Sequence, residues 1–292
     1  PSSRIAVQPR PQPGPPRPAG GTLDPQLTET LPLTTPDLNP ASVAESLEVD
    51  ERLLPYMPYL LQDLWALGSA IDEIIALAGS LGLPPKSRAL DLGCGKGAVA
   101  VRLASELRLE VVGIDAMASF LADAERKASE HRVSDLCDFR HLDALEFVSR
   151  EHDFDLVILA SVGGIFGSFA DTAARLRSQV RPGGYMLIDD GYLKHGGRMS
   201  RRGYAHYRDH DETVAELTVF GDVLLREAST TDASSRINDE FQRLIEERGR
   251  ELMAMHPELS MDIIAYLDGQ AEECRVIMDQ LEGAVWLLRK AQ

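Results

Sequence analysis

The sequence predicts an α/β protein built on a parallel β-sheet with helices on both faces. From residue 88 to residue 190, short apolar and β-branched runs alternate with helical stretches of roughly ten to twenty residues. Strands buried on both faces of a sheet are continuously apolar, and a helix usually connects two parallel strands. The expected strands are residues 88–92, 109–114, 136–141, 154–160 and 185–188.

The pattern changes after Asp190. A loop rich in glycine and arginine (191–203) precedes a short helix near 211–219 and a strand that starts at 222. A helical stretch broken at His256-Pro257 separates that strand from a final strand at 283–290. We therefore expect one α/β domain, residues 86–231 and 283–292, with a helical insertion at 232–282. The insertion is expected to form a lid, a homodimer surface or core packing against the amino-terminal helix.

Two segments precede this domain. Eleven of the 17 prolines lie within residues 1–40, so residues 1–45 are expected to form a disordered arm, with a ligand for a proline-binding domain as the alternative. Residues 46–85 are expected to form a helical segment. Within it, apolar spacing from Pro58 to Leu81 predicts one amphipathic helix before the prolines at 84 and 85.

The composition restricts the location and the partners. A net charge of −16 argues against nucleic acid and anionic membranes as partners, since lysine and arginine make most phosphate contacts. No apolar run approaches the roughly 20 residues that span a bilayer, and residues 1–20 lack a secretory signal, so a cytoplasmic location is expected. The charge is uneven: residues 209–282 hold 19 acidic and 6 basic side chains, whereas residues 194–208 hold five basic and no acidic ones.

The stretch "LDLGCGKG" at residues 90–97 places three glycines where a strand turns into a helix. Glycine tolerates positive φ and lets a ligand lie against the backbone, and a helix amino end offers free N–H groups, so a nucleotide-like ligand is expected. Gly93, Gly95 and Ala98, with Asp115 further on, formally match the dinucleotide fingerprint. However, a carboxylate at Asp91 would repel a pyrophosphate and attract an ammonium or sulfonium group.

Residues 86–190 resemble the class I S-adenosylmethionine-dependent methyltransferases. "LDLGCGKG" matches their acid followed by GxGxG, and "VVGIDA" and "FRHLDALEF" are similar to their second and third strands. "FDLVILASVGGIFG" and "LRSQVRPGGYMLIDD" are similar to the fourth strand and to the turn into the fifth. The resemblance implies a Rossmann-like doubly wound sheet of seven strands, mostly parallel with a reversed last strand. It also implies S-adenosyl-L-methionine as the cofactor and methyl transfer as the activity.

The resemblance also implies which residues bind the cofactor. Asp91 would hold the methionine ammonium, Asp115 the ribose hydroxyls, and Asp143 would meet the adenine edge. For Asp115 and Asp143, helix capping is the alternative explanation. The other implied residues are Gly93, Gly95 and Gly97 beneath the cofactor, Ala116, Met117 and Ala144 near the adenine, and Ala160 and Ser161 near the methionine part.

The acceptor is less well indicated. The fourth strand ends in Ala-Ser-Val-Gly-Gly and not in the Asn/Asp-Pro-Pro-Tyr of enzymes that methylate nucleobase amines or glutamine amides, which favours a small-molecule acceptor. A protein acceptor stays an alternative. A general base, if needed, is expected beyond a strand end, at Asp190 or His195, with Asp189, Tyr192 and His206 as further candidates. No metal site is expected, because His206 and His210 lack the third ligand of a zinc motif.

The basic loop suggests an anionic acceptor. Carboxylate or phosphate could be recruited by Lys194, Arg198, Arg201 and Arg202. A solvated loop that pairs with the acidic insertion is an equal alternative. Two other functions compete with methyl transfer: a non-catalytic protein that binds a nucleoside or a partner chain, and an NAD-dependent oxidoreductase.

Overall fold

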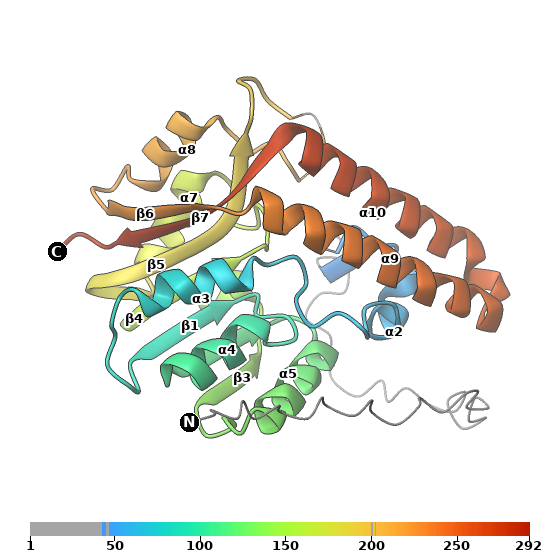
Figure 1. The fold of residues 1–292 in the computed structure, drawn as a ribbon, viewed down its shortest axis with the longest axis horizontal. Coiled ribbons are helices and arrows are strands. Elements are labelled where there is room, and N and C mark those ends of the chain that lie inside the picture. The colour runs from blue at the N-terminus through green and yellow to red at the C-terminus, as the bar shows by residue number, and fades with distance from the viewer. Residues whose placement is uncertain (1–42, 45–46, 200, 202) are drawn as a thin grey trace, which may run out of the picture. The chain divides into compact units, whose positions relative to one another are not determined.

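Seven strands form one sheet in the order β3-β2-β1-β4-β5-β7-β6 (Figure 1). The computed structural model describes residues 43–44, 47–199, 201 and 203–292. The strands are β1 (Arg88–Leu92), β2 (Glu110–Asp115), β3 (Cys137–His141), β4 (Phe154–Ala160), β5 (Val180–Leu193), β6 (Val223–Ser229) and β7 (Leu281–Arg289). All seven predicted strands are found.

The directions of the strands match the predicted Rossmann-like sheet with a reversed last strand. β1 pairs in parallel with β2 and β4, β2 with β3, and β4 with β5. β7 is antiparallel to both β5 and β6. The carboxyl ends of β1 to β5 therefore meet at one edge of the sheet, where ligands bind in open α/β folds.

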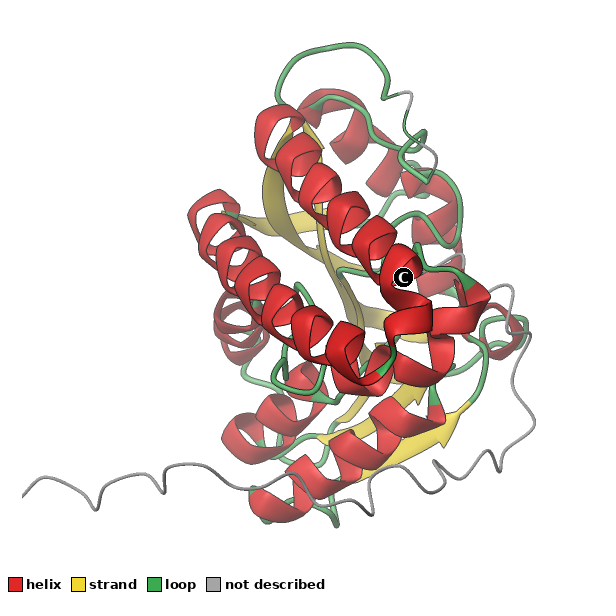
Figure 2. Cartoon of the chain, turned by 90° about the vertical axis from the view of Figure 1, so that its right-hand side faces the viewer, coloured by secondary structure: helices red, strands yellow, loops and turns green. Residues whose placement is uncertain are grey.

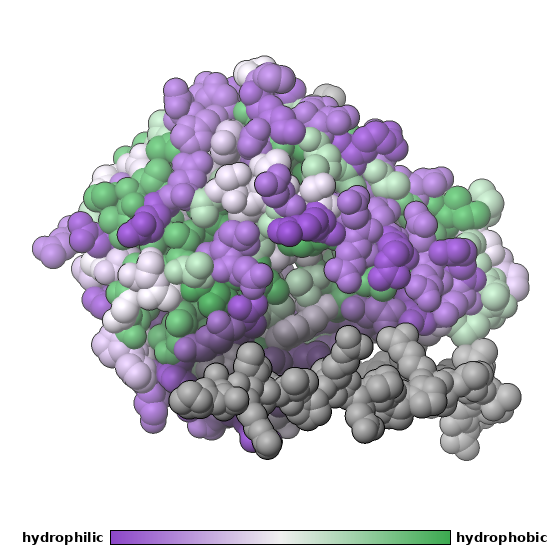
Figure 3. All heavy atoms as spheres, in the orientation of Figure 1, coloured by the Kyte–Doolittle hydropathy of each residue, from purple (hydrophilic) through white to green (hydrophobic). Residues whose placement is uncertain are grey.

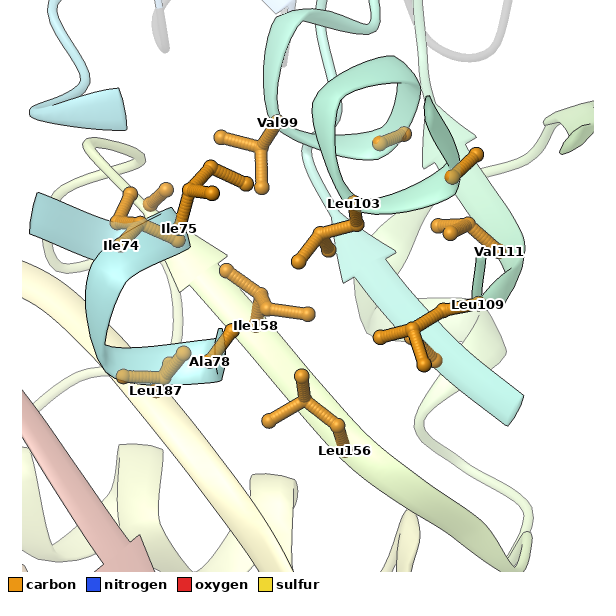
Figure 4. Close-up of a cluster of buried hydrophobic side chains, with 14 of the residues drawn as sticks. Ile74, Ile75, Ala78, Val99, Leu103, Leu109, Val111, Leu156, Ile158 and Leu187 are labelled. Atoms are coloured by element: carbon orange, nitrogen blue, oxygen red, sulfur yellow. The ribbon is translucent and has the colours of Figure 1, made fainter. Parts of the chain in front are cut away.

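Alternate residues of β1, β2, β4, β5 and β7 enter two different cores, one on each face of the sheet. Leu156 and Ile158 of β4 belong to one core, and Val157 and Leu159 to the other. The first core packs against α3 (Ile71–Gly79) and α4 (Ala98–Leu107), as Figure 4 shows. Such two-sided burial explains the continuous apolar runs of these strands.

The second face is covered by α7 (Phe169–Arg177) and α8 (His210–Leu217). Phe169 of α7 meets Trp286 of β7 edge to face, with ring centroids 5.8 Å apart. A capping box at Ser168 and Asp171 starts α7. The remaining helices of the sheet region are α5 (Ala118–Glu130) and the short α6 (Ala144–Phe147).

Two long helices connect β6 to β7. They are α9 (Thr231–Met255) and α10 (Ser260–Gln280), which lie antiparallel (Figure 2), with a 3-10 turn η3 (Pro257–Leu259) between them. The break predicted at His256-Pro257 is confirmed. Hydrophilic side chains cover the face of α9 that Figure 3 shows.

The far ends of α9 and α10 form a third core with the amino-terminal segment. That segment consists of η2 (Glu51–Tyr56) and α2 (Met57–Leu60). Ile245 of α9 and Ile263 of α10 are completely buried there, together with Met57. The core packing expected for the insertion is therefore present at this end.

The structure corrects two predicted elements. The single helix from Pro58 to Leu81 is two helices, α2 and α3, because Gly68 has φ +104° and Ala70 N–H donates to the Asp189 carboxylate instead of to a helical carbonyl. The fifth strand, predicted at 185–188, extends to Leu193 because β7 pairs with it as far as that residue. Asp189 and Asp190 thus lie within a strand and not in a loop.

The predicted disordered arm at 1–45 falls outside the described residues, except for residues 43 and 44. Within the described part of the chain, no helix is both long and apolar enough to cross a bilayer.

Two glycines with nearly the same φ allow a test of close packing at the amino end of α4. Gly97 has φ +74°, and a Cβ there would lie 2.7 Å from the Cβ of Ala124; Gly183 has φ +73° and open space around that position. We expect Gly97→Ala to lower the free energy of unfolding by about 2–5 kcal/mol, because backbone strain and overpacking add. Gly183→Ala should cost about 1–2 kcal/mol from strain alone. Chemical denaturation measures both, and equal losses would contradict the packing role of Gly97.

Candidate active site

A cavity of about 780 Å³ lies at the carboxyl edge of the parallel strands. The strand ends and the turns after β1, β2 and β4 form one wall. The opposite wall comes from the loop after β5 and from α9 and α10, with side chains such as Phe241 and Tyr266. The cavity therefore has a sheet side and a helix side.

The glycine turn after β1 is tied to the end of β2. The N–H groups of Gly93 and Cys94 donate to the carbonyl of Ile114 at 2.8 and 2.9 Å. Gly93 and Gly95 line the cavity with φ values of +70° and +52°, and a Cβ at Gly93 would lie 2.7 Å from Val162. This turn needs glycine because side chains would both strain the backbone and fill the cavity wall.

Asp91 places a buried carboxylate beneath this turn. It is 1% exposed and lines the cavity, and its Oδ2 has no hydrogen-bond partner among the described residues. Burial raises the pKa of Asp91 to about 7, against the opposing effect of the Ala100 N–H. An unpartnered buried carboxylate costs free energy, which a cationic ligand in the cavity would recover.

Asp115 ends β2 and connects two turns of the cavity wall. Its Oδ2 accepts from Gly95 N–H at 2.8 Å and its Oδ1 accepts from Met117 N–H at 2.9 Å. Burial raises the pKa of Asp115, and the two N–H donors oppose that effect. Ala116 and Met117 line the cavity beside it.

Asp143 caps α6, which is the alternative role that the sequence suggests for this residue. Its Oδ1 accepts from Leu145 N–H at 2.7 Å and from Glu146 N–H at 3.3 Å. It also lines the cavity, as does Ala144. Capping and ligand contact are therefore compatible at this residue.

The end of β4 is joined to β5 by side-chain hydrogen bonds. Ser161 has φ +53°, and its hydroxyl donates to Asp189 Oδ2 at 3.1 Å. The same oxygen accepts from Ala70 N–H at 2.8 Å, and burial raises the pKa of Asp189 to about 7. Ala160 and Ser161 line the cavity next to this link.

Asp190 faces the helix side of the cavity together with two residues of the following loop. Its Oδ1 accepts from the Tyr207 hydroxyl at 2.6 Å and from Gly191 N–H at 2.9 Å. Its Oδ2 lies 3.9 Å from His206 Nε2, which has no hydrogen-bond partner among the described residues. Burial, and then the charge of Asp190, raise the pKa of Tyr207 well above its ordinary value, so this phenol stays protonated.

A second tyrosine–carboxylate pair lies beside the first. The Tyr204 hydroxyl donates to Glu273 of α10, and the rings of Tyr204 and Tyr207 are 5.5 Å apart. Glu273 also accepts from Gln270 at 3.1 Å, and burial raises its pKa. All of these residues line the cavity.

Several predicted site residues lie elsewhere. His195 is exposed and does not line the cavity, so this predicted base is not at the site. Lys194 and Arg198 also lie off the cavity wall, with Lys194 Nζ donating to the Met278 carbonyl at 2.7 Å. Arg201 pairs with Glu48 of the amino-terminal segment, so this ion pair is not the expected pairing of the loop with the acidic insertion.

Two further predicted residues differ from expectation. Gly97 is not part of the cavity wall, because its missing side chain makes room for Ala124 and Phe139. Arg202 falls outside the described residues.

Sequence reasoning missed most of the helix side. Glu273, Tyr204 and Tyr207 were not predicted, because nothing in their local sequence indicates that they face the cofactor turns. His206 was considered as a base, and it is the histidine of this loop that reaches the cavity. In the described ranges, no group of three His, Cys, Asp or Glu side chains is arranged to hold a metal ion.

The comparisons with known proteins agree with this architecture. A family model described as a methyltransferase domain matches residues 84–249, which is more than half of the chain. The chain belongs to the methyltransferase-domain family. The resemblance to class I methyltransferases inferred from "LDLGCGKG" and the strand ends is thereby confirmed.

Curated relatives of this methyltransferase domain match it over part of their length. The uncharacterized protein YjhP of Escherichia coli is 34% identical over 123 residues, which cover 42% of this chain and 49% of YjhP. The 27-O-demethylrifamycin SV methyltransferase of Amycolatopsis mediterranei is 33% identical over 117 residues, 39% of this chain and 42% of that enzyme. The chain thus spans about half the length of the curated relatives it matches.

Solved structures share the fold more completely. A methyltransferase from Geobacter sulfurreducens, crystallised with S-adenosyl-L-homocysteine, has a TM-score of 0.69 and 21% identity over 79% of this chain and 96% of that one. The structure of E. coli YjhP has a TM-score of 0.66 and 20% identity over 80% of this chain and 98% of that one. At these identities the likeness confirms the Rossmann-like methyltransferase fold.

The buried carboxylate of Asp91 predicts a pH-dependent stability of the ligand-free protein. Between about pH 4 and pH 7 the unfolded chain ionises this group freely, whereas the folded protein keeps it protonated because the charge would be buried, so stability is lost as the pH rises through this range. Asp91→Asn should therefore raise the free energy of unfolding by up to about 4 kcal/mol at pH 8 and by about 1.5 kcal/mol at pH 5. Urea titrations at the two pH values measure this gain. The exposed Asp135→Asn is the control, and a gain that does not grow with pH would contradict the burial of the Asp91 charge.

Proposed function

We propose that the chain transfers a methyl group from S-adenosyl-L-methionine to a small-molecule acceptor by in-line displacement. The observation that carries this proposal is Asp91, whose buried, unpartnered oxygen faces the glycine turn of a methyltransferase fold. A cofactor with an ammonium group fits that oxygen, and a backbone without side chains at Gly93 and Gly95 fits a ligand that passes close to it. The pyrophosphate of NAD would face the same carboxylate unfavourably.

Each cofactor residue then has a defined task. Asp91 would hold the ammonium, and Asp115 would receive the ribose hydroxyls on the outer lone pairs of a carboxylate already fixed by two N–H donors. Ala116, Met117, Asp143 and Ala144 would surround the adenine, and Ala160 and Ser161 the methionine part. Gly97 would act through packing of α4 and not through contact with the cofactor.

The chemistry that the protein must add is modest. When bound, the sulfonium supplies an activated methyl group. The chain's part is to hold the acceptor in line with it and to keep water out, which the wall formed by α9 and α10 provides. Asp190 and His206 both line the cavity, so either side chain could receive a proton from the acceptor.

The charges of the cavity bear on the acceptor class. The basic residues expected to recruit an anion, Lys194, Arg198 and Arg201, do not line it. Lys96 is the one lysine or arginine among the described lining residues, and its Nζ donates to the Leu61 carbonyl at 2.6 Å and lies 3.3 Å from the Asp123 carboxylate. This wall supports an uncharged or cationic acceptor better than the anionic one expected from the basic loop.

Calorimetry with three ligands tests the proposal. S-adenosylmethionine and S-adenosylhomocysteine should bind and NAD should not, and Asp91→Asn should weaken S-adenosylhomocysteine binding by about tenfold or more, since it removes a charge-assisted hydrogen bond. Asp135→Asn is the matched control. Binding of NAD alone would refute the proposal, and cofactor binding without turnover of any acceptor would favour a non-catalytic binding protein.

The affinity for S-adenosylhomocysteine should also depend on pH. Only ionised Asp91 attracts an ammonium, and its pKa is about 7, so affinity should fall as the pH drops below 7, approaching tenfold per pH unit. Calorimetric titrations with S-adenosylhomocysteine at several values between about pH 5.5 and pH 8 measure how the affinity changes with pH. The dependence should flatten in Asp91→Asn, and a wild-type affinity that does not change with pH would show that Asp91 is not the ammonium ligand.

A homodimer through the insertion at 232–282 and a cytoplasmic location stay predictions. Met261 is 76% exposed and Ile264 is 42% exposed on α10, which leaves apolar side chains for such a surface. The mass of the protein in solution, compared with that of a Met261→Glu and Ile264→Glu double variant, tests the dimer.

A further inference from the structure

We propose that the acceptor is an amine that binds as its ammonium form on the helix side of the cavity and gives its proton to His206. This inference rests on the proposed function, because it takes the sheet side of the cavity as the cofactor site. It starts from two independent observations: the charges of the helix side and the unpartnered nitrogen of His206.

The helix side presents acceptor atoms and negative charge. Asp190 of β5 and Glu273 of α10 line this part of the cavity, and Glu48 of the amino-terminal segment lines the same cavity in an ion pair with Arg201, which is not a lining residue. The hydroxyls of Tyr204 and Tyr207 are already used, since Tyr204 donates to Glu273 and Tyr207 to Asp190. Arg201 neutralises Glu48, but among the described residues neither Asp190 nor Glu273 has an ion pair with a lysine or arginine, so these two carboxylates would repel an anionic acceptor and attract an ammonium.

Aromatic rings add to this preference. Phe241 and Tyr266 line the same side of the cavity, as does Tyr204, whose ring already has the Arg201 guanidinium 5.4 Å from its centroid. The faces of aromatic rings attract cations, and ring and carboxylate together are a common means of binding an organic ammonium. The combination favours an amine over a neutral hydroxyl compound.

His206 supplies the second observation. Its Nδ1 lies 3.1 Å from the Gly203 carbonyl, which can only accept, so Nδ1 carries a proton, and in the neutral imidazole Nε2 then carries the lone pair. The side chain is 8% exposed and lines the cavity. Nε2 has no partner among the described residues, and a buried nitrogen without a donor is unfavourable.

Asp190 completes the site. Its Oδ2 faces Nε2 at 3.9 Å, so two atoms that accept hydrogen bonds lie close together without a donor between them. An ammonium has several N–H donors and can satisfy both. The imidazolium formed by proton transfer would then be stabilised by the adjacent carboxylate.

In the proposed reaction, the amine loses a proton before it accepts the methyl group. The ammonium N–H bond breaks and its proton passes to His206 Nε2, which leaves a lone pair on the amine nitrogen. That pair forms the new N–CH₃ bond while the bond from the methyl group to the donor sulfur breaks, and the sulfur keeps its electron pair as a thioether. His206 releases the proton to solvent after the product leaves.

Three probes of similar shape test the charge preference. In protein saturated with S-adenosylhomocysteine, calorimetry at pH 7.5 should show benzylamine binding at least about tenfold more tightly than benzyl alcohol, with benzoate weakest. Glu273→Gln and Asp190→Asn should each lower benzylamine affinity and leave benzyl alcohol affinity unchanged. Equal affinity for the three probes, or tighter binding of benzoate, would overturn the proposal.

Nitrogen NMR of labelled histidine tests the proton acceptor without needing the natural substrate. The Nε2 signal of His206, assigned by its loss in His206→Asn, should shift in the direction expected for a nitrogen that accepts a hydrogen bond when benzylamine is added and not when benzoate is added. Asn is chosen because its amide can keep the bond to the Gly203 carbonyl. The signal of the exposed His195, on the same loop, is the control, and a His206 signal that does not respond to benzylamine would refute the role of His206.

The two proposals fail separately. Loss of S-adenosylhomocysteine binding would refute the cofactor assignment, and the probe titrations in the ligand-free protein would still decide the amine preference. Normal cofactor binding with no preference for benzylamine would refute only the amine proposal.

Discussion

The turn after β1 is the constraint on which the site depends. Parallel pairing of β1 with β2 and β4 brings three chain reversals to one edge of the sheet, and the first of them must pass beneath a ligand. The turn meets this requirement by bonding Gly93 and Cys94 to the Ile114 carbonyl and Gly95 to the Asp115 carboxylate. The position of Asp91 and the outline of the cavity both follow from this link between two strand ends.

The fold could be predicted from the sequence because its signals are local. Each strand is an apolar run flanked by a turn, and Asp91 and Asp115 stand at fixed distances from those runs. The errors also have physical causes. The break between α2 and α3 depends on a hydrogen bond from Ala70 to Asp189, more than one hundred residues away, which no helical periodicity can reveal.

The helix side of the cavity was the part that the sequence could not predict. Charge alone suggested Lys194, Arg198 and Arg201 as ligands, but charge does not determine the direction in which a loop side chain points. The contact between Tyr204 and Glu273 joins residues 69 positions apart and exists only because α10 returns over the loop after β5. Such contacts are set by tertiary packing, so His206 could be named as a candidate but not preferred over His195.

The connection between β6 and β7 has a further consequence. These two strands are antiparallel neighbours, so a turn of a few residues would suffice to join them, yet residues 230–280 stand in its place. The connection between β6 and β7 thus forms one wall of the cavity, whereas the strand ends of the sheet form the opposite wall. Natural variation in this connection can alter the helix side of the cavity while the strand register and the sheet side are left intact, so the fold allows one wall to change without disturbing its core.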